Sequence, residues 1–308
     1  MRGKTVVITG ATSGLGASAA RSLAEQGARI LFTARDENRG AATLAMLRGV
    51  NPNAGHEMVL ADLTTLADMR RAGEMLAARA GQVDVLVNNA GAIFQRRSLT
   101  ADGLEMTFAV NHMAYFLITE CLRPTLAPGA RIVSTASVAH QSSALDFDDM
   151  TLAKVSPGLF AMVAYGRSKL CNILWTRELA RRLVGTGITA NCFHPGGVNT
   201  GFGDNLKGFA GHAFGLAKRF MLTPAQGADT LVWLASSPDA AGHTGDYWYK
   251  RRVLKPSAAA QDPQAAQRLW DESVRLAGAP LETSLDRGQA GLLQRPGAQL
   301  PHGNEPVV

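Results

Sequence analysis

The feature that most constrains this chain is a regular alternation of short apolar runs with segments of helical period from Lys4 to Gly196. The runs predict strands at 4–9, 28–34, 56–63, 83–91, 130–137 and 187–196, and the segments between them predict helices at 15–27, 36–50, 66–81, 108–122 and 164–183. Near-continuous apolar strands that alternate with helices form a parallel sheet covered on both faces. We therefore expect an α/β fold with a doubly wound, Rossmann-like parallel sheet, whose ligands lie beyond the carboxyl ends of its strands.

The length of 308 residues fits a single α/β domain. We expect one dinucleotide-binding and catalytic domain at 1–284, in which a helix from Pro224 follows a substrate loop at about 201–223. Glycines and aromatic residues in that loop suit a lid over an apolar ligand; the alternative is an amphipathic helix in peripheral contact with a membrane. Residues 285–308 are rich in Gly, Pro and Gln, which predicts an extended or disordered tail.

Composition and charge narrow the compartment and the partners. Three widely spaced cysteines, Cys121, Cys171 and Cys192, show neither metal-ligand spacing nor a disulfide framework, which favours a reducing, cytoplasmic compartment. The sequence has no secretion signal and no apolar run of about 18 residues, so we expect no transmembrane segment. The net charge is +6, and its densest basic run, "KRRVLK" at 250–255, indicates either an anionic partner or a solvated loop or strand edge. We favour the solvated edge and expect no nucleic-acid partner.

The stretch "TGATSGLG" lies between the first predicted strand and the first predicted helix. Its glycines, Gly10, Gly14 and Gly16, let the backbone turn sharply and approach a ligand without a clash from a Cβ atom. The amides and the dipole of the following helix N-terminus favour a pyrophosphate there, and Thr12 and Ser13 add hydroxyl donors. This loop is therefore our candidate cradle for the phosphates of a dinucleotide.

The end of the second predicted strand bears on the choice of cofactor. An acidic residue just after this strand favours NAD by hydrogen-bonding the ribose 2′-hydroxyl, whereas an arginine accommodates the 2′-phosphate of NADP. Here Ala34 fills the usual acid position and Arg35 follows it, so we expect NADP(H) to be favoured over NAD(H). Arg39 would assist about one helical turn further on, and we interpret Asp36 as a helix N-cap rather than a ribose ligand.

The sequence "YGRSK" places Tyr165 and Lys169 four residues apart, on one face of a predicted helix. A nearby ammonium stabilises a phenolate and lowers the pKa of the tyrosine, which lets it exchange a proton with an alcohol or a carbonyl. Ser137 ends the strand "ARIVSTAS" and would orient the substrate oxygen from the carboxyl edge of the sheet. A Tyr and a Lys at this spacing are common on helix surfaces, so the pair alone does not identify a site.

The chain resembles the short-chain dehydrogenases/reductases on motifs that occur in that family's order. These are "TGATSGLG" (9–16), "NNAG" (88–91), the asparagine of "VNHMAYF", "STAS" (134–137), "YGRSK" (165–169) and "HPGGVNT" (194–200). The resemblance covers about residues 4–250. It implies a Rossmann-like fold and an oxidoreductase that uses a nicotinamide cofactor and acts on CH–OH groups.

The resemblance also implies a role for each matching position. It makes Tyr165 the catalytic acid/base, Lys169 the residue that lowers its pKa and binds the nicotinamide ribose, and Ser137 the holder of the substrate oxygen. Asn111 would anchor a water that relays protons through Lys169. The other implied cofactor positions are Leu15 in the glycine loop, Asp62 and Leu63 near the adenine, Asn89, Ala90 and Gly91 along the adenosine ribose, and Pro195, Gly196, Val198 and Thr200 around the nicotinamide carboxamide. Asn111 and the "NNAG" asparagines also suit structural bracing, and the two roles are compatible.

Three longer segments resemble the retinol dehydrogenase branch of the family, including its oxidoreductases with WW domains. They are "SLTADGLEMTFAVNHMAYFLIT", "YGRSKLCNILWTRELARRL" and "AAQRLWDESVRLAG". This likeness implies a lipophilic alcohol or carbonyl substrate. Phe94, Gln95 and Arg96 follow "NNAGAI", and we expect them at the pocket rim. We also expect a homo-oligomer. An NADP(H)-binding sensor, an NAD(H)-preferring dehydrogenase, and an epimerase or dehydratase remain the alternatives.

Overall fold

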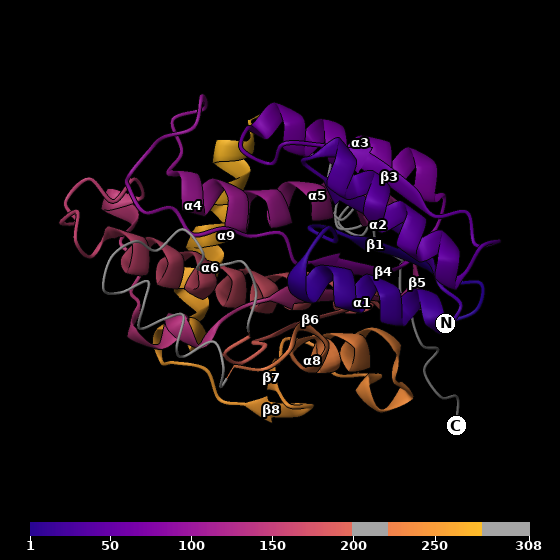
Figure 1. Cartoon of the computed structure of the whole chain (residues 1–308). Coiled ribbons are helices and arrows are strands. Elements are labelled where there is room, and N and C mark those ends of the chain that lie inside the picture. Colours follow the sequence, from indigo (N-terminus) through magenta and orange to yellow (C-terminus); the bar gives the residue numbers. More distant parts are fainter. Residues whose placement is uncertain (199–220, 279–308) are drawn as a thin grey trace, which may run out of the picture. The chain divides into compact units, whose positions relative to one another are not determined.

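One sheet runs through the described residues, 1–198 and 221–278, of the computed structural model (Figure 1). Its strand order is β3-β2-β1-β4-β5-β6-β7-β8, and neighbouring strands are parallel except for the antiparallel pair β7 and β8. The strands are β1 (Thr5–Ile8), β2 (Arg29–Ala34), β3 (Glu57–Leu60), β4 (Val83–Asn88), β5 (Leu126–Thr135), β6 (Thr189–Phe193), β7 (Tyr247–Tyr249) and β8 (Arg252–Leu254). The order reverses between β1 and β4, which is where a doubly wound sheet binds its ligand. The predicted fold class is confirmed.

Helices cover both faces of this sheet. One face carries α1 (Gly14–Glu25), α2 (Glu37–Val50) and α8 (Pro224–Ser236); the other carries α3 (Leu66–Ala80), α5 (Ala114–Leu122) and α6 (Phe160–Arg182). A further helix, α9 (Pro263–Ala277), packs against α6. Because α6 lies between the sheet and α9, it is buried around most of its circumference, and its apolar residues form no single stripe.

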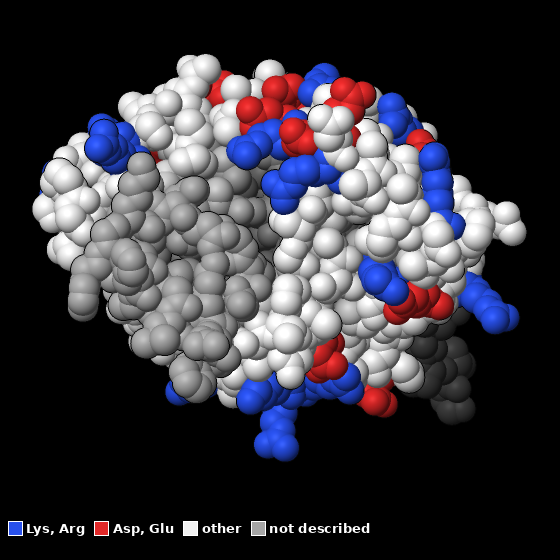
Figure 2. All heavy atoms as spheres, in the orientation of Figure 1, with Lys and Arg blue, Asp and Glu red and all other residues white. Residues whose placement is uncertain are grey.

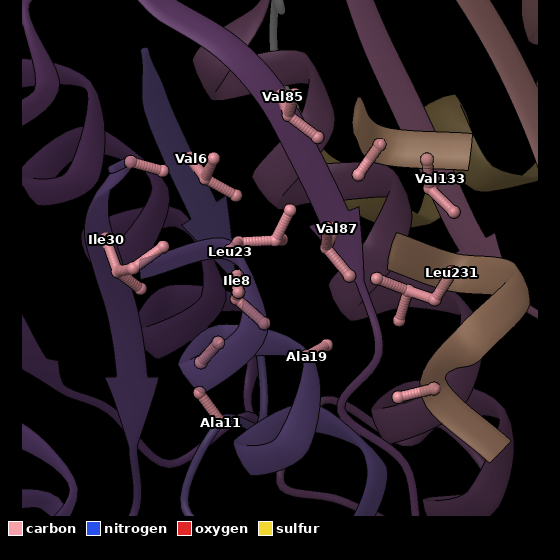
Figure 3. Packing of buried hydrophobic residues seen from close by; sticks show 14 of the residues in the cluster. Val6, Ile8, Ala11, Ala19, Leu23, Ile30, Val85, Val87, Val133 and Leu231 are labelled. Atoms are coloured by element: carbon pink, nitrogen blue, oxygen red, sulfur yellow. The ribbon is translucent and has the colours of Figure 1, made fainter. Parts of the chain in front are cut away.

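The larger core fills the space between the sheet and the layer of α1 and α8. Figure 3 shows Val6 and Ile8 of β1 beside Val87 of β4, with Leu23 of α1 and Leu231 of α8 packed over them. All five side chains are buried. Each apolar side chain of this size contributes about 1.5–3 kcal/mol when it leaves water, so this layer fixes the strand ends that carry the site.

Several helix starts are set by side chains that the sequence shows. Asp36 accepts a hydrogen bond from the Arg39 amide at 2.8 Å, which confirms its interpretation as an N-cap. Thr223 and Gln226 form a reciprocal capping box around Pro224, so the helix predicted from that proline begins there. The first of these caps engages the Asp36 carboxylate with its own helix.

Three features depart from the predicted elements. The helix expected at 108–122 contains a π-helical turn, η1 (Ala109–Met113), between the short α4 (Met106–Phe108) and α5. The hairpin of β7 and β8 and the helix α9 were not predicted. β8 adds an antiparallel edge to an otherwise parallel sheet.

The basic run at 250–255 lies in this hairpin. Lys250 and Arg251 form its turn, with positive φ angles of 48° and 59°. β8 is exposed along its length, so the interpretation as a solvated strand edge is confirmed. Figure 2 shows basic side chains at the lower edge of the molecule, near the place of β7 and β8 in Figure 1, with acidic side chains beside them.

Residues Met1–Gly278 form one compact unit. The predicted boundary between 284 and 285, the predicted tail, and residues 201–220 of the predicted substrate loop lie outside the described residues. Among the residues that are described, no helix is both long and apolar enough to cross a membrane.

Candidate active site

The glycine loop lies tightly against the end of β4. A Cβ atom on Gly10 would lie 2.7 Å from the Cα of Ala90, and one on Gly16 would lie 2.2 Å from the carbonyl oxygen of Gly10. Gly10 and Gly14 also have positive φ angles, 71° and 52°, that side chains disfavour. The close packing of strand, loop and helix therefore requires these glycines.

The N-terminus of α1 fits an anionic ligand. Its first turn carries no acidic residue, and its N-cap residue, Ser13, makes no capping hydrogen bond with its side chain. Free amides at a helix start and the helix dipole attract phosphate. Arg39 reaches over the loop, with its Nη2 3.5 Å from the carbonyl oxygen of Thr12, and Arg35 is exposed after β2. These residues fit the phosphates of a dinucleotide, and Leu15 is buried beneath them.

The ends of β3 and β4 place the residues predicted to meet the adenosine. Asp62 is exposed and Leu63 is buried just beyond β3. The Asn89 side chain donates to the carbonyl oxygens of Thr9 and Gly10 at 3.2 and 3.1 Å. The Thr9 hydroxyl accepts from the amides of Asn89 and Ala90. These hydrogen bonds brace the end of β4, and they hold Asn89 and Ala90 beside the glycine loop.

Asn111 lies in the π-helical turn η1 and is fully buried. Its Oδ1 accepts from the Ala92 amide at 2.8 Å, and its Nδ2 donates to the Ala92 carbonyl at 3.0 Å and to the Ser168 hydroxyl at 2.9 Å. A Cβ atom on Gly91 would lie 3.2 Å from that Oδ1 and 3.7 Å from the Nζ of Lys169. Asn111 therefore braces the segment after β4 beside Lys169. π-Helical turns occur often at functional sites.

Ser137 and Tyr165 meet at the end of β5. Ser137 is half-buried, and η3 (Val138–Ser142), a short 3₁₀ helix, begins directly after it. Burial raises the pKa of Tyr165 to about 12, while a hydrogen bond with Ser137 acts to lower it. The predicted lowering of the Tyr165 pKa is absent in the protein alone because removal from water outweighs the stabilising contacts.

Lys169 is buried one helical turn beyond Tyr165. Burial lowers the pKa of Lys169 to about 7, and its Nζ donates to the Thr135 carbonyl at 2.9 Å. The same Nζ lies 5.7 Å from the ring centroids of both Tyr165 and Tyr115. An ammonium with this pKa is poised to exchange its proton near neutral pH.

The segment predicted to embrace the nicotinamide follows β6. Gly196 has a φ of 81°, and its amide donates to the Nδ1 of His194 at 3.2 Å. Val198 forms a parallel bridge with Leu222, whose amide donates to the Gly197 carbonyl at 2.8 Å. Pro195 borders a hollow of about 470 Å³ that Leu222 and Tyr249 also line. Thr200 lies outside the described residues.

The structure thus gathers Asn111, Ser137, Tyr165 and Lys169 around the ends of β4 and β5, while Phe94, Gln95 and Arg96 lie in a half-exposed to exposed loop after β4. Thr135, Tyr115 and His140 were not among the predicted site residues. Tyr115 follows Asn111 by four residues, a spacing that predicts that both lie on one face of a helix. The backbone contact of Thr135 leaves no signal in its residue type.

Residues 10–250 match the family model described as Enoyl-(Acyl carrier protein) reductase, which represents short-chain dehydrogenases/reductases. The chain is a short-chain dehydrogenase/reductase. Its family membership agrees with the glycine loop and with the Ser137, Tyr165 and Lys169 arrangement.

Two relatives and one solved structure show which members of the family this chain is similar to. The chain is 39% identical to retinol dehydrogenase 14 of Homo sapiens over 299 residues, covering 90% of this chain and 87% of the relative. It is 35% identical to the WW domain-containing oxidoreductase of Danio rerio over 281 residues, covering 89% and 68%. It is also similar to a crystal structure of a short chain dehydrogenase from Burkholderia cenocepacia J2315 in complex with NADP, with a TM-score of 0.64, 27% identity and coverage of 85% and 99%. The predicted resemblance is confirmed, and the chain is an oxidoreductase that acts on CH–OH groups with NAD(P).

Proposed function

We propose that this short-chain dehydrogenase/reductase interconverts a lipophilic alcohol and its carbonyl compound with NADP(H). The observation that carries the proposal is the hydrogen bond between Ser137 and the half-buried Tyr165, with Lys169 one turn further along α6. A sensor of the cofactor needs no such proton-handling set. The proposed reaction places the substrate oxygen between Ser137 and Tyr165.

When bound, the cofactor supplies or accepts a hydride at the substrate carbon. In reduction, the phenol of Tyr165 gives its proton to the substrate oxygen; in oxidation, the phenolate takes that proton back. The Ser137 hydroxyl holds the oxygen in line. Lys169, whose pKa is about 7, returns a proton to the phenolate of Tyr165 after reduction. Asn111 keeps the segment beside Lys169 in place.

The cofactor preference follows from the end of β2. Ala34 leaves no carboxylate to bind a ribose 2′-hydroxyl, and the Asp36 carboxylate is occupied as an N-cap. Arg39 contacts the glycine loop, and Arg35 is exposed directly after β2, so the two arginines suit a 2′-phosphate. The similar structures solved with NADP or NADPH support the same preference.

Lipophilic character of the substrate is supported by the retinol dehydrogenases among the relatives and by exposed apolar side chains near the start of α6. Met162, three residues before Tyr165, is 64% exposed, and Leu159 is 63% exposed. Because α6 has 3.6 residues per turn, Met162 and Tyr165 lie on neighbouring parts of one face. An apolar substrate would extend along this face from the reacting oxygen.

Replacement of Tyr165 tests the proposal. The protein is assayed for NADPH oxidation and NADP⁺ reduction with a panel of long-chain and cyclic aldehydes, ketones and alcohols that includes all-trans-retinal and retinol. We expect Tyr165→Phe to lose about 10²- to 10⁴-fold in turnover, since a positioned acid/base contributes that much, while NADPH binding is retained. Tyr115→Phe is the matched control, because its ring lies equally close to the Nζ of Lys169. Unchanged turnover in Tyr165→Phe would refute the assignment, and NADPH binding without turnover on the whole panel would favour a sensor.

A further inference from the structure

His140 is a fully buried histidine in η3, three residues after Ser137. Its Nδ1 lies 2.7 Å from the Ser137 carbonyl oxygen, and its Nε2 lies 3.1 Å from the Ser257 amide nitrogen. The Ser257 amide can only donate, so Nε2 must accept and the ring proton resides on Nδ1, which donates to Ser137. Both ring nitrogens of a neutral imidazole are therefore used by backbone groups.

The His140 ring is also held by aromatic neighbours. The His140 and Tyr247 rings pack edge to face, with ring centroids 5.1 Å apart. Tyr247, of β7, also stacks with His194, with centroids 5.6 Å apart. Burial lowers the pKa of His140, which keeps the imidazole neutral near physiological pH and preserves the acceptor that Ser257 requires. The contact with Tyr247 and the two backbone hydrogen bonds therefore fix the orientation of the His140 ring.

These contacts join the reacting end of β5 to a segment far along the chain. Ser257 lies between β8 and α9, 117 residues after His140. On the other side, the carbonyl held by His140 belongs to the residue whose hydroxyl meets Tyr165. A short 3₁₀ helix has poor hydrogen-bond geometry of its own, so an external anchor has a large effect on its position.

We propose that His140 is a positioning residue, which holds Ser137 against Tyr165 by clamping the Ser137 carbonyl to the Ser257 backbone. The inference rests on the proposed function, and it assigns the segment ahead of α9 a part in the geometry of the site. His140 acts through Ser137 and does not touch the substrate.

The consequence is electrostatic as well as geometric. Tyr165 is faced by Lys169 on its own helix, by Tyr115 from α5 and by Ser137 from β5. Of these, the Ser137 hydrogen bond and the positive charge of a protonated Lys169 favour the phenolate. If Ser137 moves away, the pKa of Tyr165 rises further. In the reduction direction the phenol then keeps its proton to higher pH, so the pH above which activity falls shifts to alkaline values.

The test compares His140→Ala with His140→Asn, whose side-chain amide reproduces a donor at the position of Nδ1. kcat, the KM for NADPH and the pH profile of kcat are measured with the best carbonyl substrate from the panel. We expect His140→Ala to lose about 10- to 100-fold in kcat, with less than about a twofold change in the KM for NADPH, and to shift the profile alkaline by about half a unit to one unit. His140→Asn keeps the donor to Ser137 but lacks the acceptor for Ser257, so it should recover only part of both effects. His243→Ala, which removes a half-exposed histidine, is the control.

A second pair tests the far end of the clamp and serves if His140→Ala fails to fold. Ser257→Pro removes the amide that donates to Nε2, whereas Ser257→Ala retains it. We expect an alkaline shift in Ser257→Pro only. A wild-type profile in folded His140→Ala or in Ser257→Pro, or equal losses in His140→Ala and His140→Asn, would overturn the inference. An inactive Tyr165→Phe beside an unaffected His140→Ala removes only this inference, whereas an active Tyr165→Phe removes the proposed function itself.

Discussion

At the scale of single residues, Gly166 is as constrained as the catalytic candidates beside it. A Cβ atom there would lie 2.7 Å from the Ala139 carbonyl oxygen and 2.3 Å from the Ser143 hydroxyl. The Ala139 carbonyl is backbone and cannot rotate away, so any side chain at 166 pushes η3 off α6. The smallest residue is therefore what lets Ser137 and Tyr165 approach one another.

We expect Gly166→Ala to lower kcat about tenfold or more while NADPH binding changes less than about twofold, because a displacement of about 1 Å at the reacting groups is costly. Steady-state kinetics and NADPH titration measure the two effects. Gly158→Ala is the matched control, since nothing lies within 4 Å of a Cβ atom there. Equal kinetics in the two variants would show that η3 accommodates the methyl group.

Arg35 carries the cofactor prediction at the same scale. We expect Arg35→Ala to weaken NADPH binding about 10- to 100-fold and NADH binding less than about twofold, because only NADPH has the 2′-phosphate that a guanidinium binds. Binding titrations with both cofactors measure this difference. Arg48→Ala removes another exposed arginine of α2 and should leave both affinities unchanged. Equal losses for both cofactors would remove Arg35 as the 2′-phosphate ligand.

At the scale of elements, α9 is joined to the π-helical turn η1 by a buried histidine. The Nε2 of His112 donates to the Ser273 hydroxyl at 2.9 Å, because that hydroxyl gives its own proton to the Leu269 carbonyl. Phe116 of α5 and Trp270 of α9 pack edge to face with centroids 5.3 Å apart. α9 therefore stabilises the segment that contains Asn111 from outside the site.

His112 should make the fold sensitive to acid. Burial lowers the pKa of His112 from 6.5 to about 3, so between these values the unfolded chain binds the proton that the folded protein excludes. The contribution of neutral His112 to stability is present above pH 6.5 and is lost as the pH drops toward 3, by a total of about 5 kcal/mol at about 1.4 kcal/mol per unit. Urea unfolding at several pH values measures this slope. We expect His112→Leu to flatten it and His243→Gln to leave it unchanged.

At the scale of the whole molecule, the larger core joins the central strands to α1 and α8. Leu23 of α1 is fully buried in the cluster that joins β1, β4 and α8 (Figure 3). We expect Leu23→Ala to lower the free energy of unfolding by about 2–5 kcal/mol. Urea unfolding measures the loss, and Val184→Ala, at a side chain that is 78% exposed, should cost less than about 0.5 kcal/mol. A loss of similar size in both variants would contradict the importance of this layer.

Much of this architecture could be predicted from residue patterns because strands buried on both faces leave long apolar runs. The hairpin of β7 and β8 could not, since its strands have three residues each and its turn uses Lys250 and Arg251 instead of glycine. The π-helical turn at Asn111 keeps an apolar helical pattern and so has no signal of its own. α9 was readable, because its buried Ala266, Leu269, Trp270 and Ser273 recur at helical spacing.

The candidate site also has a part that could be predicted from the sequence and a part that could not. Its glycines, Tyr165 and Lys169 follow from motifs in short stretches of sequence, where the chemistry requires a residue type at a fixed spacing. The raised pKa of Tyr165 depends on burial by distant segments, and the contact of His140 with Ser257 joins residues 117 positions apart. No local pattern records either of these.

The bridge between Val198 and Leu222 brings the two ends of an intervening stretch of chain together. Because those ends are already joined by backbone hydrogen bonding, lengthening the stretch adds little cost: each doubling of a loop costs only about 0.6 kcal/mol in closure entropy. Val198 and Leu222 are therefore the natural junctions for replacing the sequence between them with that of a relative. Libraries that vary the sequence between Val198 and Leu222, assayed on the proposed alcohol and carbonyl substrates, would test whether substrate preference is set between these two positions.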